Sequence, residues 1–269
     1  MIRQPAVANQ FYPGVPRQLA ATIKVMTPEV AEADKITALA VVSPHAGYIY
    51  SGPVAAATFA RVRIPADIVI LGPNHHGLGA PLAIVSEGSW AMPFGEVPIN
   101  QALSELIKRH LPQAREDSIA HRQEHSLEVQ VPFLQTARAG ISLSPLVVSQ
   151  LDYADCREIG LGLARALKAF GRPVLMVAST DMTHYQPRTV ASRQDHLALA
   201  RVTALDPEGL YHTVLDHGIT MCGFIPTTIT LLAALELGAT KAELISYSDS
   251  GEASGDTSRV VGYAGLVIS

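Results

Sequence analysis

Three short apolar runs, each followed by a histidine or an acid, constrain the fold of this chain most. The runs occupy residues 38–44 (ALAVVSP), 66–72 (ADIVILG) and 174–180 (VLMVAST). They are rich in β-branched residues and bounded by Pro or Gly, which is typical of strands buried on both faces of an α/β sheet. Ligands of open α/β sheets bind beyond the carboxyl ends of the strands. We therefore expect the side chains that follow these runs to meet in one crevice, where they suggest a metal centre: His45, His75, Asp181 and His184.

The rest of the chain alternates between the periodicities of helices and strands. Apolar residues recur at helical spacing over residues 100–111, 153–170, 191–205 and 224–237, and short apolar runs at 83–86, 143–148, 242–247 and 263–268 predict further strands. No stretch resembles a linker, and the Gly-rich residues 250–256 are expected to form a loop beside the pocket. The pattern predicts a single α/β domain over residues 1–269, with a mixed, mostly parallel central sheet flanked by helices.

Charge and composition exclude several classes of partner. Lys and Arg number 20 against 24 Asp and Glu, a net charge of −4 without long runs, so we expect no nucleic-acid partner. No segment approaches the ~20 apolar residues that span a bilayer, and none resembles a leader peptide, so we expect no membrane partner. Two cysteines, Cys156 and Cys222, fit a reducing compartment and predict a cytoplasmic protein. The charge balance favours a small molecule or another protein as the partner.

Two histidine motifs repeat the order strand, proline, histidine, glycine. His45 lies in SPHAGYIYSG, residues 43–52, and His75 lies in GPNHHG, residues 72–77. Adjacent histidines on an extended backbone point different ways, so we expect His75 to be a ligand and His76 to orient a substrate. Two neutral imidazoles suit Fe, Zn, Cu and Ni alike.

A third ligand is expected to be anionic, and the candidates are Asp181, Glu124 and Cys222. Cys222 precedes an apolar helix, whose dipole would lower the pKa of the thiol. The alternative role for Cys222 is that of a buried structural thiol at the start of the helix. His184 lies three residues beyond Asp181 and suits proton transfer near neutral pH. The alternative role for Asp181 is to cap the turn that follows it.

One segment indicates a different enzyme. His121, Glu124 and His125 match the H-x-x-E-H pattern of zinc peptidases, in which both histidines on one helix bind zinc and the glutamate acts as general base. Against this alternative, Pro132 is expected to break such a helix, and the other histidine motifs would have no role. The motifs of serine hydrolases and nucleotide-binding enzymes are absent.

Beside the two histidine motifs, the chain carries five further motifs: residues 3–13 (RQPAVANQFYP), 124–130 (EHSLEVQ), 179–184 (STDMTH), 221–223 (MCG) and 262–265 (GYAG). With these motifs in this order, the chain resembles the Memo family, relatives of the class III extradiol ring-cleaving dioxygenases. The resemblance implies a fold like that of the dioxygenase catalytic subunits. It also implies that His45, His75 and Cys222 are the metal ligands, with Asp181 and His184 beside them.

In the dioxygenase relatives the ligands are two histidines and a glutamate around Fe(II), and a histidine matched by His184 acts on the catechol proton. Cys222 replaces that glutamate here. A thiolate keeps the charge of a carboxylate, but it is softer and oxidisable, which also admits Zn or Cu.

We therefore predict an Fe(II)-dependent, extradiol-dioxygenase-like oxidoreductase that acts on a catechol-type substrate. His184 would be the acid and base, Asp181 would tune its protonation, and the expected substrate contacts are His76, Tyr48, Glu124 and His125. The alternative is a non-catalytic protein that uses the same crevice to hold a metal or an anionic side chain of a protein partner.

Overall fold

A nine-stranded mixed sheet forms the centre of the structure, a computed structural model that describes all residues from Met1 to Ser269. Its strand order is β10-β12-β2-β9-β3-β8-β4-β7, with β11 paired to β12. The four central strands β2, β9, β3 and β8 are parallel, whereas β12 and β4 run antiparallel to their neighbours in that group. The strands are β2 (Ala40–Ser43), β3 (Asp67–Pro73), β4 (Leu82–Ile84), β7 (Arg115–Glu116), β8 (Ser142–Val148), β9 (Val174–Ser179), β10 (His184–Gln186), β11 (Ala242–Asp249) and β12 (Val260–Ile268).

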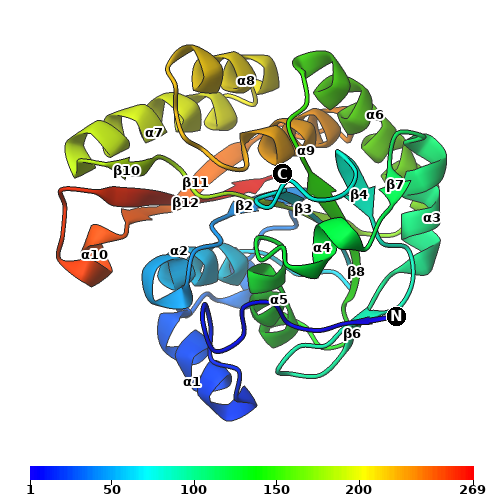
Figure 1. Cartoon of the computed structure of the whole chain (residues 1–269), viewed down its shortest axis with the longest axis horizontal. Coiled ribbons are helices and arrows are strands. Elements are labelled where there is room, and N and C mark those ends of the chain that lie inside the picture. Colours follow the sequence, from blue (N-terminus) through cyan, green and yellow to red (C-terminus); the bar gives the residue numbers. More distant parts are fainter.

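Helices cover both faces of this sheet (Figure 1). Side chains of the buried strands alternate between two cores: Val69 and Leu71 of β3 pack into one, and Ile68 and Ile70 into the other. The first core lies under α3 (Gln101–His110), α6 (Tyr153–Phe170), α7 (Arg188–Thr203), α8 (Pro207–Asp216) and α9 (Phe224–Glu236). The second lies under α1 (Pro16–Met26), α2 (Tyr48–Ala60) and α5 (Val131–Ala137). This architecture confirms the predicted α/β fold with a mixed sheet between helices.

The four helices and the strands expected from periodicity are all present, with ends that differ by three residues at most. The Gly-rich residues 250–256, expected as a loop, include the single-turn helix α10 (Gly251–Ser254). Pro132 lies at the start of α5 and does not break a helix, because a proline in the first turn loses no intrahelical hydrogen bond. None of the helices combines the length and the apolar character needed to cross a bilayer.

Helix α2, which follows β2 and the loop that contains His45, was not predicted from the sequence. Its sequence contains Gly52 and Pro53, which normally disfavour a helix interior, so the periodicity is masked. A Cβ at position 52 would lie 2.6 Å from the sulfur of Met26, so glycine allows α1 and α2 to pack closely. The short loop between β2 and α2 carries His45.

The N-terminal segment is fastened to the second core through one buried carboxylate. Glu128 accepts hydrogen bonds from Arg3 Nη1 and the Ala6 N–H, each at 2.7 Å, and from Tyr12 Oη at 2.6 Å. It also accepts from the Val7 N–H at 3.1 Å. The segment further adds β1 (Ile2–Arg3) to β5 (Ser89–Trp90) and β6 (Val97–Pro98) in a small second sheet. Arg3 also donates to the carbonyl oxygens of His121 and Glu124, so the N-terminal segment is held beside the part of the chain that contains these two residues.

Candidate metal centre

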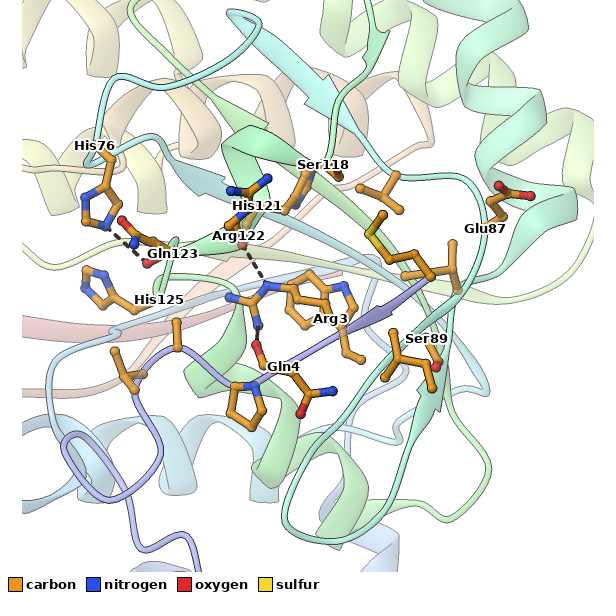
Figure 2. A pocket seen from close by; sticks show the side chains of 18 of the residues that line it. Arg3, Gln4, His76, Glu87, Ser89, Ser118, His121, Arg122, Gln123 and His125 are labelled. Atoms are coloured by element: carbon orange, nitrogen blue, oxygen red, sulfur yellow. Dashed lines mark hydrogen bonds between the residues drawn. The ribbon is translucent and has the colours of Figure 1, made fainter.

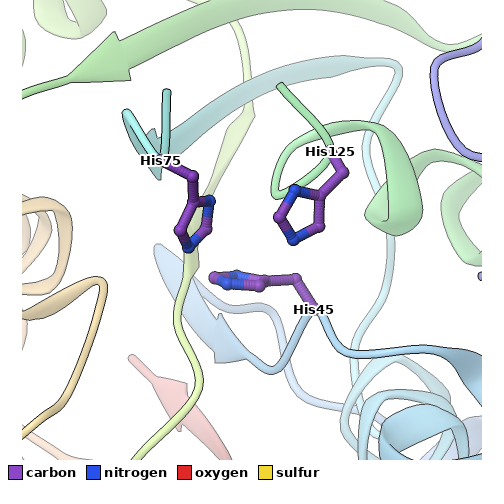
Figure 3. Close-up of side chains that lie close together, drawn as sticks. All are labelled: His45, His75 and His125. Carbon is purple, nitrogen blue, oxygen red and sulfur yellow. The ribbon is translucent and has the colours of Figure 1, made fainter. Parts of the chain in front are cut away.

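Three histidines from separate segments converge at the carboxyl edge of the sheet (Figure 3). His45 and His75 each lie two residues beyond the ends of β2 and β3, and His125 follows the short helix α4 (Ile119–Arg122). One ring nitrogen from each histidine lies within 4.8 Å of those of the other two. The rings of His75 and His125 stack with centroids 4.6 Å apart, and His45 meets both edge-on. His45 and His75 therefore lie together as expected from the strand ends, and His125 joins them.

Glu124 orients His75 through two hydrogen bonds. Its Oε2 accepts the backbone N–H of His75 at 2.7 Å, and its Oε1 lies 2.9 Å from His75 Nδ1 and accepts the Ser126 N–H. Burial raises the pKa of Glu124, but the hydrogen bond from His75 and the surrounding N–H groups outweigh it and hold the pKa well below its usual range. An ionised carboxylate only accepts, so His75 Nδ1 carries the proton and Nε2 is left free for a ligand. Glu124 was expected to contact a substrate, but it is buried against His75, with 1% of its surface exposed.

His45 and Asp181 are both buried and hold each other in place. Asp181 Oδ1 accepts the backbone N–H of His45 at 2.8 Å, so this carboxylate fastens a strand-end loop and does not cap a helix. Burial, and then the nearby His75, keep the pKa of His45 well below its usual range, which leaves the ring neutral. Burial likewise raises the pKa of Asp181, against the hydrogen bond from His45.

Cys222 adjoins the histidines through His45. Its Sγ lies 3.3 Å from His45 Nε2 and accepts the backbone N–H of Asp181 at 3.2 Å. The close approach requires glycine at position 223, because a Cβ there would lie 2.3 Å from the carbonyl oxygen of Ser179. The expectation of a lowered thiol pKa is wrong for the metal-free protein: burial, and then the charge of Asp181, raise the pKa of Cys222.

The donor set fits a divalent transition metal. With metal–nitrogen and metal–sulfur distances of about 2.0 and 2.3 Å, a tetrahedral ion places the two ligand atoms roughly 3.5 Å apart. The 3.3 Å between His45 Nε2 and Cys222 Sγ is close to that separation. Imidazole and thiolate together suit Zn, Cu and Fe.

His184 lies beside this group and outside the three-histidine cluster. Its backbone N–H donates to Thr220 Oγ1 at 2.7 Å, and Nδ1 lies 2.8 Å from the Thr220 carbonyl oxygen. Since a carbonyl only accepts, Nδ1 carries the proton and Nε2 keeps a lone pair in the neutral ring. The ring is near enough to lower the pKa of both His45 and Asp181.

The H-x-x-E-H segment does not form a peptidase site. Helix α4 ends at Arg122, so no single helix presents His121 and His125 together. His121 is buried elsewhere, with Nε2 3.2 Å from the Ala83 carbonyl oxygen and its ring near Trp90. Of the two histidines of this motif, only His125 lies with His45 and His75.

A groove of about 940 Å³ leads away from His125 (Figure 2). The N-terminal segment forms one wall, and Arg3 bridges to the opposite loop by donating to the His121 carbonyl oxygen at 2.7 Å. His76 lines the groove and is not part of the three-histidine cluster; its Nε2 lies 3.1 Å from the Gln123 carbonyl oxygen. Tyr48, expected as a substrate contact, is instead a core residue whose hydroxyl donates to the Val129 carbonyl oxygen.

Comparisons with known proteins agree over nearly the whole chain. The family model described as Memo-like protein matches residues 3–267. A MEMO1 family protein of Aquifex aeolicus is 40% identical over 267 residues, covering 99% of this chain and 98% of the relative. One of Methanopyrus kandleri is 39% identical and covers 99% of both chains. The crystal structure of an uncharacterized protein from Escherichia coli K12 is similar in fold alone, with a TM-score of 0.58 at 17% identity, over 85% of this chain and 98% of that one.

Proposed function

This chain belongs to the Memo family, and we propose that it binds one divalent metal through His45, His75 and Cys222. Two observations carry the proposal: the His45 and His75 imidazoles converge with that of His125 within 4.8 Å at the carboxyl edge of the sheet, and Cys222 Sγ lies 3.3 Å from His45 Nε2. Cys222 supplies the negative charge that two neutral imidazoles lack. His125 is the neighbouring donor, available to the metal or to a bound molecule.

We further propose that the metal is Fe(II) and that the protein is an extradiol-dioxygenase-like oxidoreductase acting on a catechol-type substrate. This part rests on the resemblance to the ring-cleaving dioxygenases, with Zn or Cu as the alternative metals. Bound Fe(II) would supply the centre at which a vicinal diol and O₂ are brought together.

The chain's own residues have distinct roles in this proposal. His184 accepts the diol proton at Nε2, because its Nδ1–H is held by the Thr220 carbonyl oxygen. Asp181 holds the His45 loop through the His45 backbone N–H, and the nearby His184 lowers the pKa of this carboxyl against the effect of burial. His76 and His125 line the groove through which a ligand would approach.

Metal analysis of single variants tests the centre. We expect one equivalent of metal in the wild-type protein and in His121→Gln, and loss of metal in His45→Ala, His75→Ala and Cys222→Ser. Full metal content in all three ligand variants would refute the site. If His125→Ala loses the metal and Cys222→Ser keeps it, the centre has three histidine ligands and no sulfur.

Turnover is tested separately, by supplying the anaerobically iron-loaded protein with O₂ and a panel of catechols. Ring cleavage, detected by the absorbance of the ring-opened product, would support the oxidoreductase. Metal binding without cleavage would favour the second candidate, a non-catalytic protein that uses the metal centre and the groove to hold a protein partner. The groove favours this candidate because it extends from His125 to Glu87, well beyond the metal centre.

A further inference from the structure

The hydroxyl of Ser179 has hydrogen-bonding partners on three sides beneath His45. Ser179 is the last residue of β9, which lies between β2 and β3, the strands that precede His45 and His75. Its Oγ donates to the Ser126 carbonyl oxygen at 2.6 Å and accepts from Gln130 Nε2 at 2.8 Å. The third neighbour is His45 Nδ1, at 2.9 Å. Ser179, Ser126 and Gln130 have no exposed surface, so no water competes for these bonds.

Only one assignment of the hydrogen-bonding protons satisfies the three contacts of the Ser179 hydroxyl. A serine hydroxyl has a single proton to donate and two lone pairs that accept. The Ser126 carbonyl oxygen can only accept, so it takes the proton, and the Gln130 N–H occupies one lone pair. The remaining lone pair faces His45, whose Nδ1 must therefore carry a proton. This holds whether the ring is neutral or charged, and in the neutral ring it leaves Nε2 unprotonated.

The orientation of the Gln130 amide is fixed by a second contact. Its Nε2 also lies 2.9 Å from the Pro44 carbonyl oxygen, so exchanging the amide nitrogen and oxygen would place two acceptors against each other. Its Oε1 is buried and has no partner in the protein. Gln130 is therefore held by its N–H groups alone, and both of them point at the loop and the serine that support His45.

We infer that Ser179 is a positioning residue that holds His45 in the Nδ1–H tautomer and presents Nε2 to the metal. The inference rests on the proposed metal centre for its consequence, but the tautomer itself does not require a metal. A histidine that must first move its proton from Nε2 binds a metal less well, and loss of such outer contacts typically lowers metal affinity 10- to 100-fold.

The tautomer can be read directly in the metal-free protein. Long-range ¹H–¹⁵N NMR of histidine-labelled protein, with His45 assigned by its absence in His45→Gln, should report Nδ1–H in the wild type. Ser179→Ala should shift the signal toward the Nε2–H form, and Ser179→Thr, which restores the hydroxyl, should return it. The matched control is Ser43→Ala. Ser43 lies directly opposite Ser179 in the sheet and is equally buried, but its hydroxyl has no partner.

Zinc affinity, measured by competition with a chelating dye, gives the second readout. We expect Ser179→Ala to bind Zn²⁺ about 10- to 100-fold more weakly, with Ser43→Ala and Ser179→Thr close to the wild type. An unchanged His45 tautomer in Ser179→Ala would overturn the inference, as would equal losses of affinity in the two alanine variants. If the wild type binds no metal while the tautomer still depends on Ser179, the positioning role stands and the proposed metal centre fails.

Discussion

Replacing Glu124 by Gln should weaken metal binding by disturbing His75, although the two side chains have almost the same shape. Glu124 Oε1 accepts two N–H groups, from His75 Nδ1 and from Ser126, and Oε2 accepts the backbone N–H of His75. An amide has only one acceptor oxygen. If that oxygen faces the two donors, the new NH₂ meets the His75 backbone N–H. In the other orientation, His75 must move its proton to Nε2, the atom proposed to bind the metal.

The magnitude follows from this geometry. One hydrogen bond to a charged group is lost and one buried donor is left unpaired, a cost of about 1.5–3 kcal/mol, which lowers Tm by about 3–12 °C in a protein of this size. Metal affinity should fall about 10- to 100-fold. A competitive zinc titration and a thermal unfolding curve of the metal-free variant measure the two effects.

The stability loss should also depend on pH. Because the folded-state pKa of Glu124 is depressed, its carboxylate stabilises the fold above the unfolded-state pKa of about 4.3, and this contribution is lost as the pH falls toward the folded-state value. The difference in Tm between the wild type and Glu124→Gln should therefore be larger at pH 7 than at pH 3.

Glu128→Gln is the matched control, because Glu128 is equally buried but clamps the N-terminal segment and contacts none of the histidines. It should lower stability by about 3–5 kcal/mol, as expected for breaking a buried ion pair, and leave zinc affinity within a few-fold of the wild type. Our reasoning would be refuted if Glu124→Gln kept wild-type zinc affinity, or if both variants lost affinity equally.

Three further predictions concern single side chains. His184→Gln should keep its metal and lower any ring-cleaving turnover by about 10²- to 10⁴-fold, so loss of metal, detected by elemental analysis, would instead make His184 a ligand. In peroxide titrations read by peptide mass spectrometry, the partly exposed Cys222 should be oxidised before the buried Cys156. Burial raises the pKa of both thiols, so access decides the order, and bound metal should slow the reaction of Cys222. Cys156 reacting first, or no protection by metal, would contradict a ligand role for Cys222. Burial lowers the pKa of His121 and of His125 to about 4, so the metal-free protein should lose stability as the pH falls from about 6.5 toward 4. The fall in Tm should be smaller in His121→Gln, and an unchanged profile would contradict the buried, neutral state of this ring.

The layered fold and the position of the site can be predicted from the amino-acid sequence. Runs such as residues 66–72 are short, rich in β-branched residues and bounded by Pro or Gly, which predicts buried strands, and the chain beyond their carboxyl ends is expected at one edge of the sheet. His45 and His75 lie together, as predicted. Helix α2 was not predicted, because Gly52 and Pro53 disfavour a helix in the sequence pattern, whereas packing against α1 stabilises it in the structure.

The neighbours of each side chain, in contrast, depend on tertiary packing between segments that are distant in the sequence. His125 joins the cluster and His121 does not, since α4 ends between them and sends the two rings to different surroundings. Local sequence suggested a low pKa for Cys222 from the helix that follows, whereas burial beside Asp181 raises it, because desolvation depends on everything packed around the sulfur. The protons on the histidines are set by partners distant in the sequence, such as Ser179 for His45, and no local pattern encodes those contacts.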